Sequence, residues 1–241
     1  HGLDAQLDRR FAAGFSLTAS YTWSHSIDNL PEQFGAGGGG LMDTRNFASS
    51  RGNSNFDTRQ RFVSSSVWEI PVGKGRHWLN RGGVLNAIAG GWEITGLLST
   101  QTGHYFTVTV PNARQRLGST SIATWWPDRI ASGHLDRPTA QRWFDTSAFV
   151  LPRGADGSWH IGNAGRDILR GDNPFNLDAG LSKSFRITER FALQFRAEAF
   201  NLTNTPTLDD PVVNIESPDF GTVRSTISNA RQLQFALRLT F

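Results

Sequence analysis

Hydrophobic and polar residues alternate strictly between Phe15 and Ser24. The apolar positions are the odd ones, and every even position between them is Ser or Thr. A period of two over this length predicts a β-strand with one apolar and one polar face. Residues 3–11 alternate in the same way, and the turn 12–14 is expected to join the two strands as a hairpin.

The same period recurs in five further segments of the chain. They are 62–70, 92–98, 175–185, 191–199 and 233–241. The first of them is weaker, because Ser64 and Ser66 stand on its apolar side. Together the segments predict seven strands of roughly 9–12 residues, a length that crosses a bilayer when the strands are tilted.

The predicted connections are of two kinds. Residues 12–14 and 186–190 form short turns, and 71–91 is intermediate. The long connections are rich in Gly, Asn, Pro and Asp, and they are 27–58, 104–173 and 201–230. Short turns at one end and long loops at the other are typical of bacterial outer-membrane barrels.

Aromatic residues stand near both ends of the predicted strands. Two such belts are typical of a membrane barrel, because amphipathic rings favour the depth of the lipid headgroups. The residues predicted to form this girdle are Tyr21, Trp23, Trp68, Trp92, Phe185 and Phe191. Lys183 falls on an apolar face, but near a short turn, so its ammonium group is expected to reach water.

The polar faces of the last strands carry amide and charged side chains. In a barrel these side chains line a water-filled lumen, whereas in a β-sandwich they must face outward. The residues predicted to face the lumen are Gln194, Arg196, Glu198, Gln232, Gln234 and Arg238. The aromatic belts favour the barrel, and a secreted or surface β-rich structural or adhesion protein is the alternative.

The predicted fold class is all-β: an antiparallel transmembrane β-barrel segment with long extracellular loops. Bacterial barrels have an even number of strands. If the last of seven strands ends at the periplasmic side, the first strand lacks its neighbour. We therefore expect residues 1–241 to form the C-terminal part of one larger outer-membrane barrel domain.

Composition narrows the classes of function. The 241 residues include no Cys, which excludes disulfides and thiol chemistry. The net charge of +3 comes from arginines scattered among acidic residues, which does not indicate a nucleic-acid-binding surface. The histidines lack the spacing of a metal site, and no catalytic constellation is found. We expect no enzymatic activity, no metal and no cofactor.

Several short strings occur along the chain in a distinctive combination. They are SYTWS at 20–24, SIDN at 26–29, NFDTRQRF at 55–62, GGWEITG at 90–96, GNAGR at 162–166, NPFNLD at 173–178 and FRAEAFN at 195–201. The combination resembles the barrel of TonB-dependent outer-membrane transporters of the Oar-like group. The resemblance implies a barrel of about 22 strands with an N-terminal plug and a TonB-contacting segment. These residues show no match to a plug or a TonB-contacting segment.

The resemblance implies a receptor and transporter that takes up a solute with energy supplied through TonB. The barrel wall and loops would be the contribution of this chain. The expected partners are outer-membrane lipid, the barrel-assembly machinery, the protein's own plug and the TonB complex. The expected location is the bacterial outer membrane. The solute and the direction of transport stay open.

Two further groups of residues are candidates for binding. The C-terminal strand resembles the signal that the barrel-assembly machinery recognises, and its residues are Phe235, Leu237, Leu239 and Phe241. The longest loop carries candidate ligand-binding aromatics, which are Trp125, Trp126, Trp143 and Trp159. Aromatic rings beside arginines bind ligands by stacking, and the alternative is that these rings pack the loop onto itself.

Overall fold

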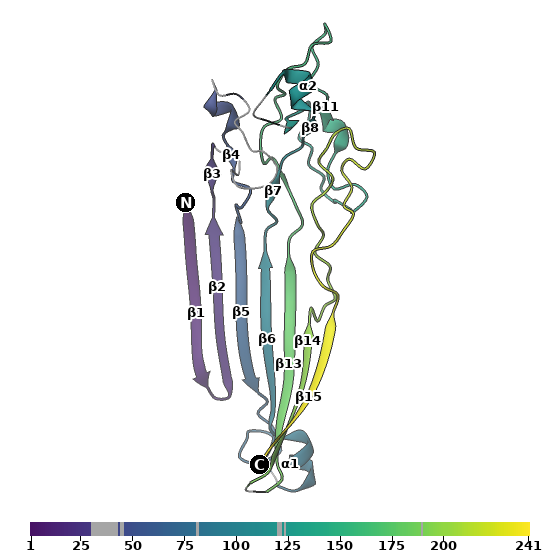
Figure 1. The fold of residues 1–241 in the computed structure, drawn as a ribbon. Helices are drawn as coiled ribbons and strands as arrows, with labels where there is room; N and C mark the ends of the chain where they lie inside the picture. The colour runs from purple at the N-terminus through teal and green to yellow at the C-terminus, as the bar shows by residue number, and fades with distance from the viewer. Residues whose placement is uncertain (30–42, 44–45, 81, 120–121, 123, 189) are drawn as a thin grey trace.

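The computed structural model describes every residue except 30–42, 44–45, 81, 120–121, 123 and 189. A large part of the predicted loop 27–58 therefore lies outside the described residues. The dominant element is a seven-stranded sheet in the order β1-β2-β5-β6-β13-β14-β15 (Figure 1). Its strands are β1 (Gly2–Ala12), β2 (Phe15–Ser24), β5 (Gln60–Glu69), β6 (Trp92–Gln101), β13 (Phe175–Arg186), β14 (Ala192–Phe200) and β15 (Gln232–Thr240).

The seven strands follow the alternating segments of the sequence closely. All neighbours in the sheet are antiparallel, and each strand pairs with the next long strand along the chain. This up-and-down order is the one that outer-membrane barrels use. The described strands form an open sheet with β1 and β15 at its edges.

The register keeps most apolar and polar side chains on separate faces of the sheet, although Arg9 lies opposite Leu17 and the β1–β2 ladder is irregular between Arg9 and Ala12. Glu198 pairs with Gln234 across β14 and β15, and Ser182 pairs with Arg196 across β13 and β14. Ser64 and Ser66 of β5 do stand on the apolar face, where Ser66 lies opposite Leu17. A slip of one residue would exchange the two faces, so the alternation in the sequence fixes this register.

The turn between β1 and β2 has the backbone expected of a tight hairpin. Ala13 and Gly14 both have positive φ, 54° and 79°. Such a two-residue turn matches the right-handed twist of the strands. A Cβ at Gly14 would lie 3.2 Å from the backbone oxygen of Glu69, a tight contact that adds to the preference of this positive-φ position for glycine.

The long connections gather at one end of the sheet, which we call the loop end (Figure 1). They contain small two-stranded sheets and short helices. These elements are β3 (Ile27–Asp28), β4 (Gly52–Asn53), β7 (Tyr105–Phe106), β8 (Val110–Pro111), β9 (Thr124–Trp125), β10 (Asp128–Arg129), β11 (Phe149–Val150), β12 (Leu169–Arg170), α2 (Ala113–Leu117), η1 (Phe47–Ser50) and η2 (Thr146–Ala148). The opposite end, which we call the turn end, carries α1 (Val84–Ala89).

The hydrophobic core lies in the loops and not in the sheet. Every buried hydrophobic side chain that the structure describes falls between Phe106 and Leu169. One cluster surrounds Phe144, and a second surrounds Trp125. We call residues 103–173, with the packed segment 207–223, the loop subdomain. The predicted loop 104–173 does connect β6 to β13, and its short elements pack around a core of their own.

Helices play a small part in the described structure. Both α1 and α2 are only one to two turns long, with 6 and 5 residues. Within the described residues, neither has the length or hydropathy of a membrane-spanning helix.

Candidate functional site

The polar face of the sheet is the first candidate surface. Hydroxyl and carboxylate side chains from neighbouring strands line a shallow hollow of about 380 Å³ on it, and they include Thr18, Ser65, Thr95, Asp178 and Glu198. Such a surface is well suited to contact water or a polar solute.

The residues predicted to face the lumen share this face. Gln194 pairs with Arg238, and Glu198 pairs with Gln234. Arg196 forms an ion pair with Glu198 two residues along the same strand. The register also places Phe200 on this face, opposite Gln232, which was not predicted. Phe200 lines the hollow together with the apolar side chains of Val67 and Leu97, so this part of the polar face also offers apolar contacts.

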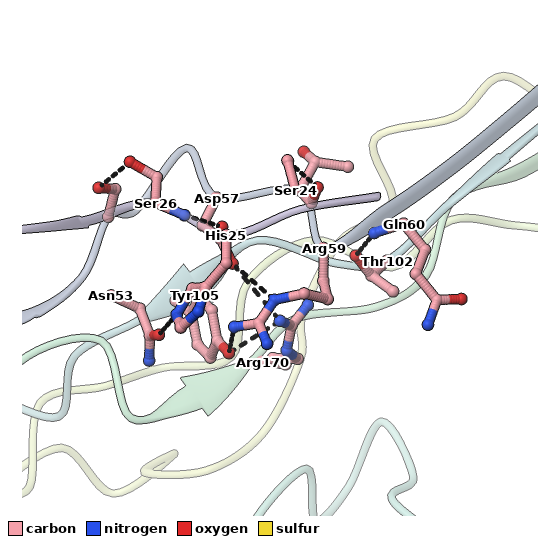
Figure 2. A network of polar contacts seen from close by, with 12 residues as sticks. Ser24, His25, Ser26, Asn53, Asp57, Arg59, Gln60, Thr102, Tyr105 and Arg170 are labelled. Atoms are coloured by element: carbon pink, nitrogen blue, oxygen red, sulfur yellow. Dashed lines mark hydrogen bonds and ion pairs between the residues drawn. The ribbon is translucent and has the colours of Figure 1, made fainter. Parts of the chain in front are cut away.

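The second candidate is a group of charged residues at the loop end, which we call the junction network (Figure 2). Its centre is Asp57, whose side chain is fully buried. One carboxylate oxygen accepts a hydrogen bond of 2.6 Å from the backbone N–H of Ser26. The other lies 3.5 Å from Arg59 Nε and 3.6 Å from Arg170 Nη2. Two guanidinium groups therefore compensate the buried negative charge.

Tyr105 links the two arginines of the junction network. Its hydroxyl accepts hydrogen bonds of 3.3 Å from Arg59 and 2.8 Å from Arg170 (Figure 2). The Arg170 guanidinium also lies 4.1 Å from the centre of the Tyr105 ring. Since Arg59 precedes β5 and Tyr105 lies in β7, the contacts attach the loop subdomain to the sheet.

A further ion pair holds the first long loop against the loop subdomain. The Arg166 guanidinium pairs with the Asp28 carboxylate and donates a 2.9 Å hydrogen bond to the Asp28 backbone oxygen. Arg166 also lies 3.6 Å from the carboxylate of Asp167. Asp28 is in the SIDN string and Arg166 ends the GNAGR string.

The strings of the sequence therefore meet in space. Asp57 and Arg59 belong to the NFDTRQRF string, and Ser26 belongs to SIDN. Gly162 of the GNAGR string passes so close to another segment that a Cβ there would lie 2.1 Å from the Pro127 backbone oxygen. The sequence did not predict the junction network, although two of these strings contained Ser26, Asp57 and Arg59, because Tyr105 and Arg170 lie outside every string.

The four tryptophans proposed as ligand-binding residues are engaged within the loop subdomain. Trp125 and Trp126 are buried in the two clusters. Trp125 donates a 3.2 Å hydrogen bond to the His160 backbone oxygen, and Trp143 donates one of 2.8 Å to that of Arg170. This geometry favours the packing alternative for Trp125 and Trp126.

Trp159 is the most arginine-rich of these aromatic positions. The guanidinium of Arg153 lies 4.0 Å from the centre of its ring system, and that of Arg116 lies 4.5 Å away. Arg116 is held in turn by a salt bridge of 2.7 Å to Glu216. The Trp159 ring, on which a ligand would stack, is therefore already in contact with two arginine side chains of the same chain.

A histidine–carboxylate pair lies at the edge of the loop subdomain. His104 Nε2 and Asp210 Oδ2 are 2.8 Å apart. The hydrogen bond to Asp210, with the neighbouring negative charge, raises the pKa of His104 above its ordinary value of 6.5. Hydrogen bonds from Ser225 and the Asp210 backbone lower the pKa of Asp209. The described residues contain no group of His, Asp and Glu arranged to hold a metal ion.

The predicted girdle residues fall at the two ends of the sheet. At the loop end Tyr21 pairs with Phe62, and Trp23 with Gln60. At the turn end the pairs are Trp68 with Phe15, Trp92 with Lys183 and Phe185 with Leu193, while Phe191 precedes β14.

The apolar side chains of the last strand and the side chain of Lys183 differ in their exposure to solvent. The C-terminal residues Phe235, Leu237, Leu239 and Phe241 are all exposed, and Phe241 is 88% exposed. Lys183, by contrast, is only 3% exposed. The prediction that its amine reaches water is wrong, because the amine donates a 2.7 Å hydrogen bond to the Ile88 backbone oxygen instead.

An up-and-down antiparallel sheet with one polar face and one apolar face that is not covered by a core is the arrangement of outer-membrane β-barrel proteins. The chain belongs to the family described as the outer membrane beta barrel domain, which matches residues 1–234. No curated protein and no solved structure matches the chain. Family membership places the protein in the bacterial outer membrane.

Proposed function

We propose that residues 1–241 form part of the wall and the extracellular loops of a TonB-dependent receptor and transporter of the Oar-like type. The observation that carries the proposal is the junction network, in which the strings that resemble this group meet around Asp57. It would hold a folded loop subdomain over the mouth of the barrel. The polar face of the sheet would line the lumen.

The open edges of the sheet support the view that these residues belong to a larger barrel. Strands β1 and β15 are exposed along their whole length. In a lipid bilayer an unpaired strand edge is very unfavourable, because its backbone polar groups find no water. We propose that further strands of the same protein pair with both edges. The plug and the TonB-contacting segment would lie outside residues 1–241.

The transport part of the proposal is tested with cells that produce the full-length protein. A panel of labelled probes would include a ferric siderophore, cobalamin and a malto-oligosaccharide. We expect protein-dependent accumulation of at least one probe, and we expect a protonophore to abolish it because TonB draws on the inner-membrane proton gradient. Cells without the protein are the control. Protein-dependent adhesion between cells, with no uptake of any probe, would contradict transport and support the adhesion alternative.

The proposal includes no enzymatic reaction at these residues. It includes one further partner, the barrel-assembly machinery. Its recognition signal would be the C-terminal strand β15 together with Phe241, which directly follows it. We expect Phe241→Ala to lower the fraction of heat-modifiable protein in the outer membrane. Phe11→Ala is a matched control, because Phe11 is also an exposed aromatic of a strand in this sheet. Equal assembly of both variants would contradict this role.

A further inference from the structure

The helix α1 lies against the apolar face of the sheet. The backbone oxygen of Ile88, in its last turn, accepts a 2.7 Å hydrogen bond from Lys183 Nζ and one of 2.9 Å from Trp92 Nε1. Lys183 and Trp92 are register partners in β13 and β6. Both belong to the alternation that carries Leu181 and Ile94 on the apolar face. Figure 1 shows α1 at the turn end, beside the ends of the strands, where it contacts the side chains of Lys183 and Trp92 on the apolar face.

Lys183 holds this arrangement in place. Its amine lies 5.0 Å from the centre of the Trp92 ring and 4.8 Å from that of Phe185. A buried ammonium group is unfavourable without a partner, and here the partner is a carbonyl at the C-terminal end of a helix. The contact satisfies the amine and also fixes the position of α1 against the sheet.

The other side of α1 is apolar and uncovered in the described structure. Val84 is 75% exposed, and Leu85 and Ile88 are each 65% exposed. Their spacing places them on one stripe of the helix. Asn86 points the other way, because its side-chain oxygen accepts a 2.6 Å hydrogen bond from the backbone N–H of Lys74. The apolar stripe therefore lies on the side of α1 opposite to the backbone around Lys74.

The composition of the surrounding turn fits an interfacial position. Trp78, in the same connection, is 56% exposed, and the exposed residues His77 and Lys74 precede it by one and four positions. A short apolar stripe with tryptophan and basic residues nearby is the composition of segments that lie in the headgroup region of a bilayer.

We propose that α1 is an interfacial anchor whose Val84, Leu85 and Ile88 enter the phospholipid leaflet that surrounds the turn end of the sheet. The apolar stripe continues an apolar face that outer-membrane barrels turn toward lipid. Long loops of such barrels are extracellular, so the leaflet is the periplasmic one. The inference rests on membership of the outer-membrane barrel family and does not require transport.

The proposal is tested by spin labels on the full-length protein in vesicles of phosphatidylethanolamine and phosphatidylglycerol. The chain has no cysteine, so Leu85→Cys gives a single attachment site within it. The measurement is the ratio of collisions with oxygen, which partitions into lipid, to collisions with a water-soluble nickel chelate. Leu17→Cys on the apolar face and Thr18→Cys on the polar face of β2 are matched controls from adjacent positions.

We expect the collision ratio of oxygen to nickel chelate at the Leu85 label to be several-fold higher than at the Thr18 label. It should be similar to the ratio at the Leu17 label. A second label at Val84 should agree with it. A ratio like that of Thr18 would overturn the proposal, since α1 would then lie in water. A label shielded from both reagents would overturn it as well, because a protein surface would then cover the stripe. A low ratio at Leu17 would overturn the lipid-facing sheet and the anchor together.

Discussion

The sheet and the loop subdomain reach order by different means. In the loop subdomain, large side chains such as Phe144 and Trp125 are almost completely buried, as in a small water-soluble domain. Along the seven long strands, the only buried side chain that the structure describes is the lysine at position 183. The sheet exposes its apolar residues because lipid is their solvent, and its backbone hydrogen bonds supply the order. The two regions should therefore respond differently to the same substitution.

The largest effect should come from the core of the loop subdomain. Leu169 is 2% exposed and Leu7, on β1, is 61% exposed. We expect Leu169→Ala to destabilise the loop subdomain by about 3 kcal/mol, because a cavity replaces the lost contacts. Limited proteolysis of assembled protein would measure this as faster loop cleavage. Leu7→Ala is the control with the identical chemical change, and loop cleavage as fast as in Leu169→Ala would contradict the distinction between the regions.

The next largest effect should come from the connection between the two regions. Asp57→Ala leaves Arg59 and Arg170 facing each other without the carboxylate. Loss of one partner of a buried ion pair costs about 3–5 kcal/mol, but both guanidinium groups are about a quarter exposed to solvent. We therefore expect about 2 kcal/mol of lost attachment.

Hydrogen–deuterium exchange of residues 103–107 would detect this loss, while heat-modifiability of the barrel stays unchanged. Asp136→Ala is the control, because Asp136 is an exposed carboxylate of the same loop subdomain. If Asp57→Ala and Asp136→Ala exchanged at the same rate, the junction network would not hold the loop subdomain to the sheet.

A smaller effect is expected at Lys183, the one buried side chain that the structure describes along the seven long strands. Lys183→Met keeps an apolar stem of similar length but removes the hydrogen bond to Ile88. Loss of a bond from a charged donor costs about 1.5 kcal/mol. A spin label at Leu85 should become more mobile in this variant, because α1 loses a contact to β13. An unchanged spectrum would show that Trp92 alone holds the helix.

The smallest effect should be a pH dependence of the stability of the loop subdomain. The pKa of His104 is raised by Asp210, so the charged pair stabilises the folded state fully below pH 6.5. The contribution is lost as the pH rises through the raised pKa of the folded state. Thermal unfolding followed by tryptophan fluorescence should therefore begin slightly earlier at pH 8.5 than at pH 6.

Asp210→Asn should remove most of this dependence, since it removes the charge that raises the pKa. His134→Gln serves as the control, because His134 is an exposed histidine of the same subdomain. A pH dependence that survives in Asp210→Asn but vanishes in His134→Gln would contradict the prediction, because the titrating group would then be His134 and not His104.

Much of the sheet could be predicted from the sequence, because a strand between lipid and water records its surroundings locally. The alternation from Phe15 to Ser24 predicted β2, and even the serine-containing segment from 62 predicted most of β5. The hairpin turn at Ala13 and Gly14 was equally local. The strand boundaries shifted by a few residues, since pairing between neighbours decides where a ladder ends.

The candidate sites were much less accessible to such reasoning. Arg166 and Asp28 are 138 residues apart in the sequence, and nothing in either segment shows that they meet. The short elements around Phe144 have no periodicity long enough to reveal a core. Lys183 looked like a residue beside a turn, because the helix that covers it comes from another connection.

The sequence by itself therefore determined the strands, their two faces and the membrane environment that those faces require. The physical reason is that each residue of a membrane strand meets either lipid or water, and the polarity of its own side chain reports which. Only the tertiary structure decided where the loops pack, which charges Asp57 neutralises and what covers Lys183. Those contacts depend on how distant segments close in space, and the free energy that fixes them is shared among residues from several connections.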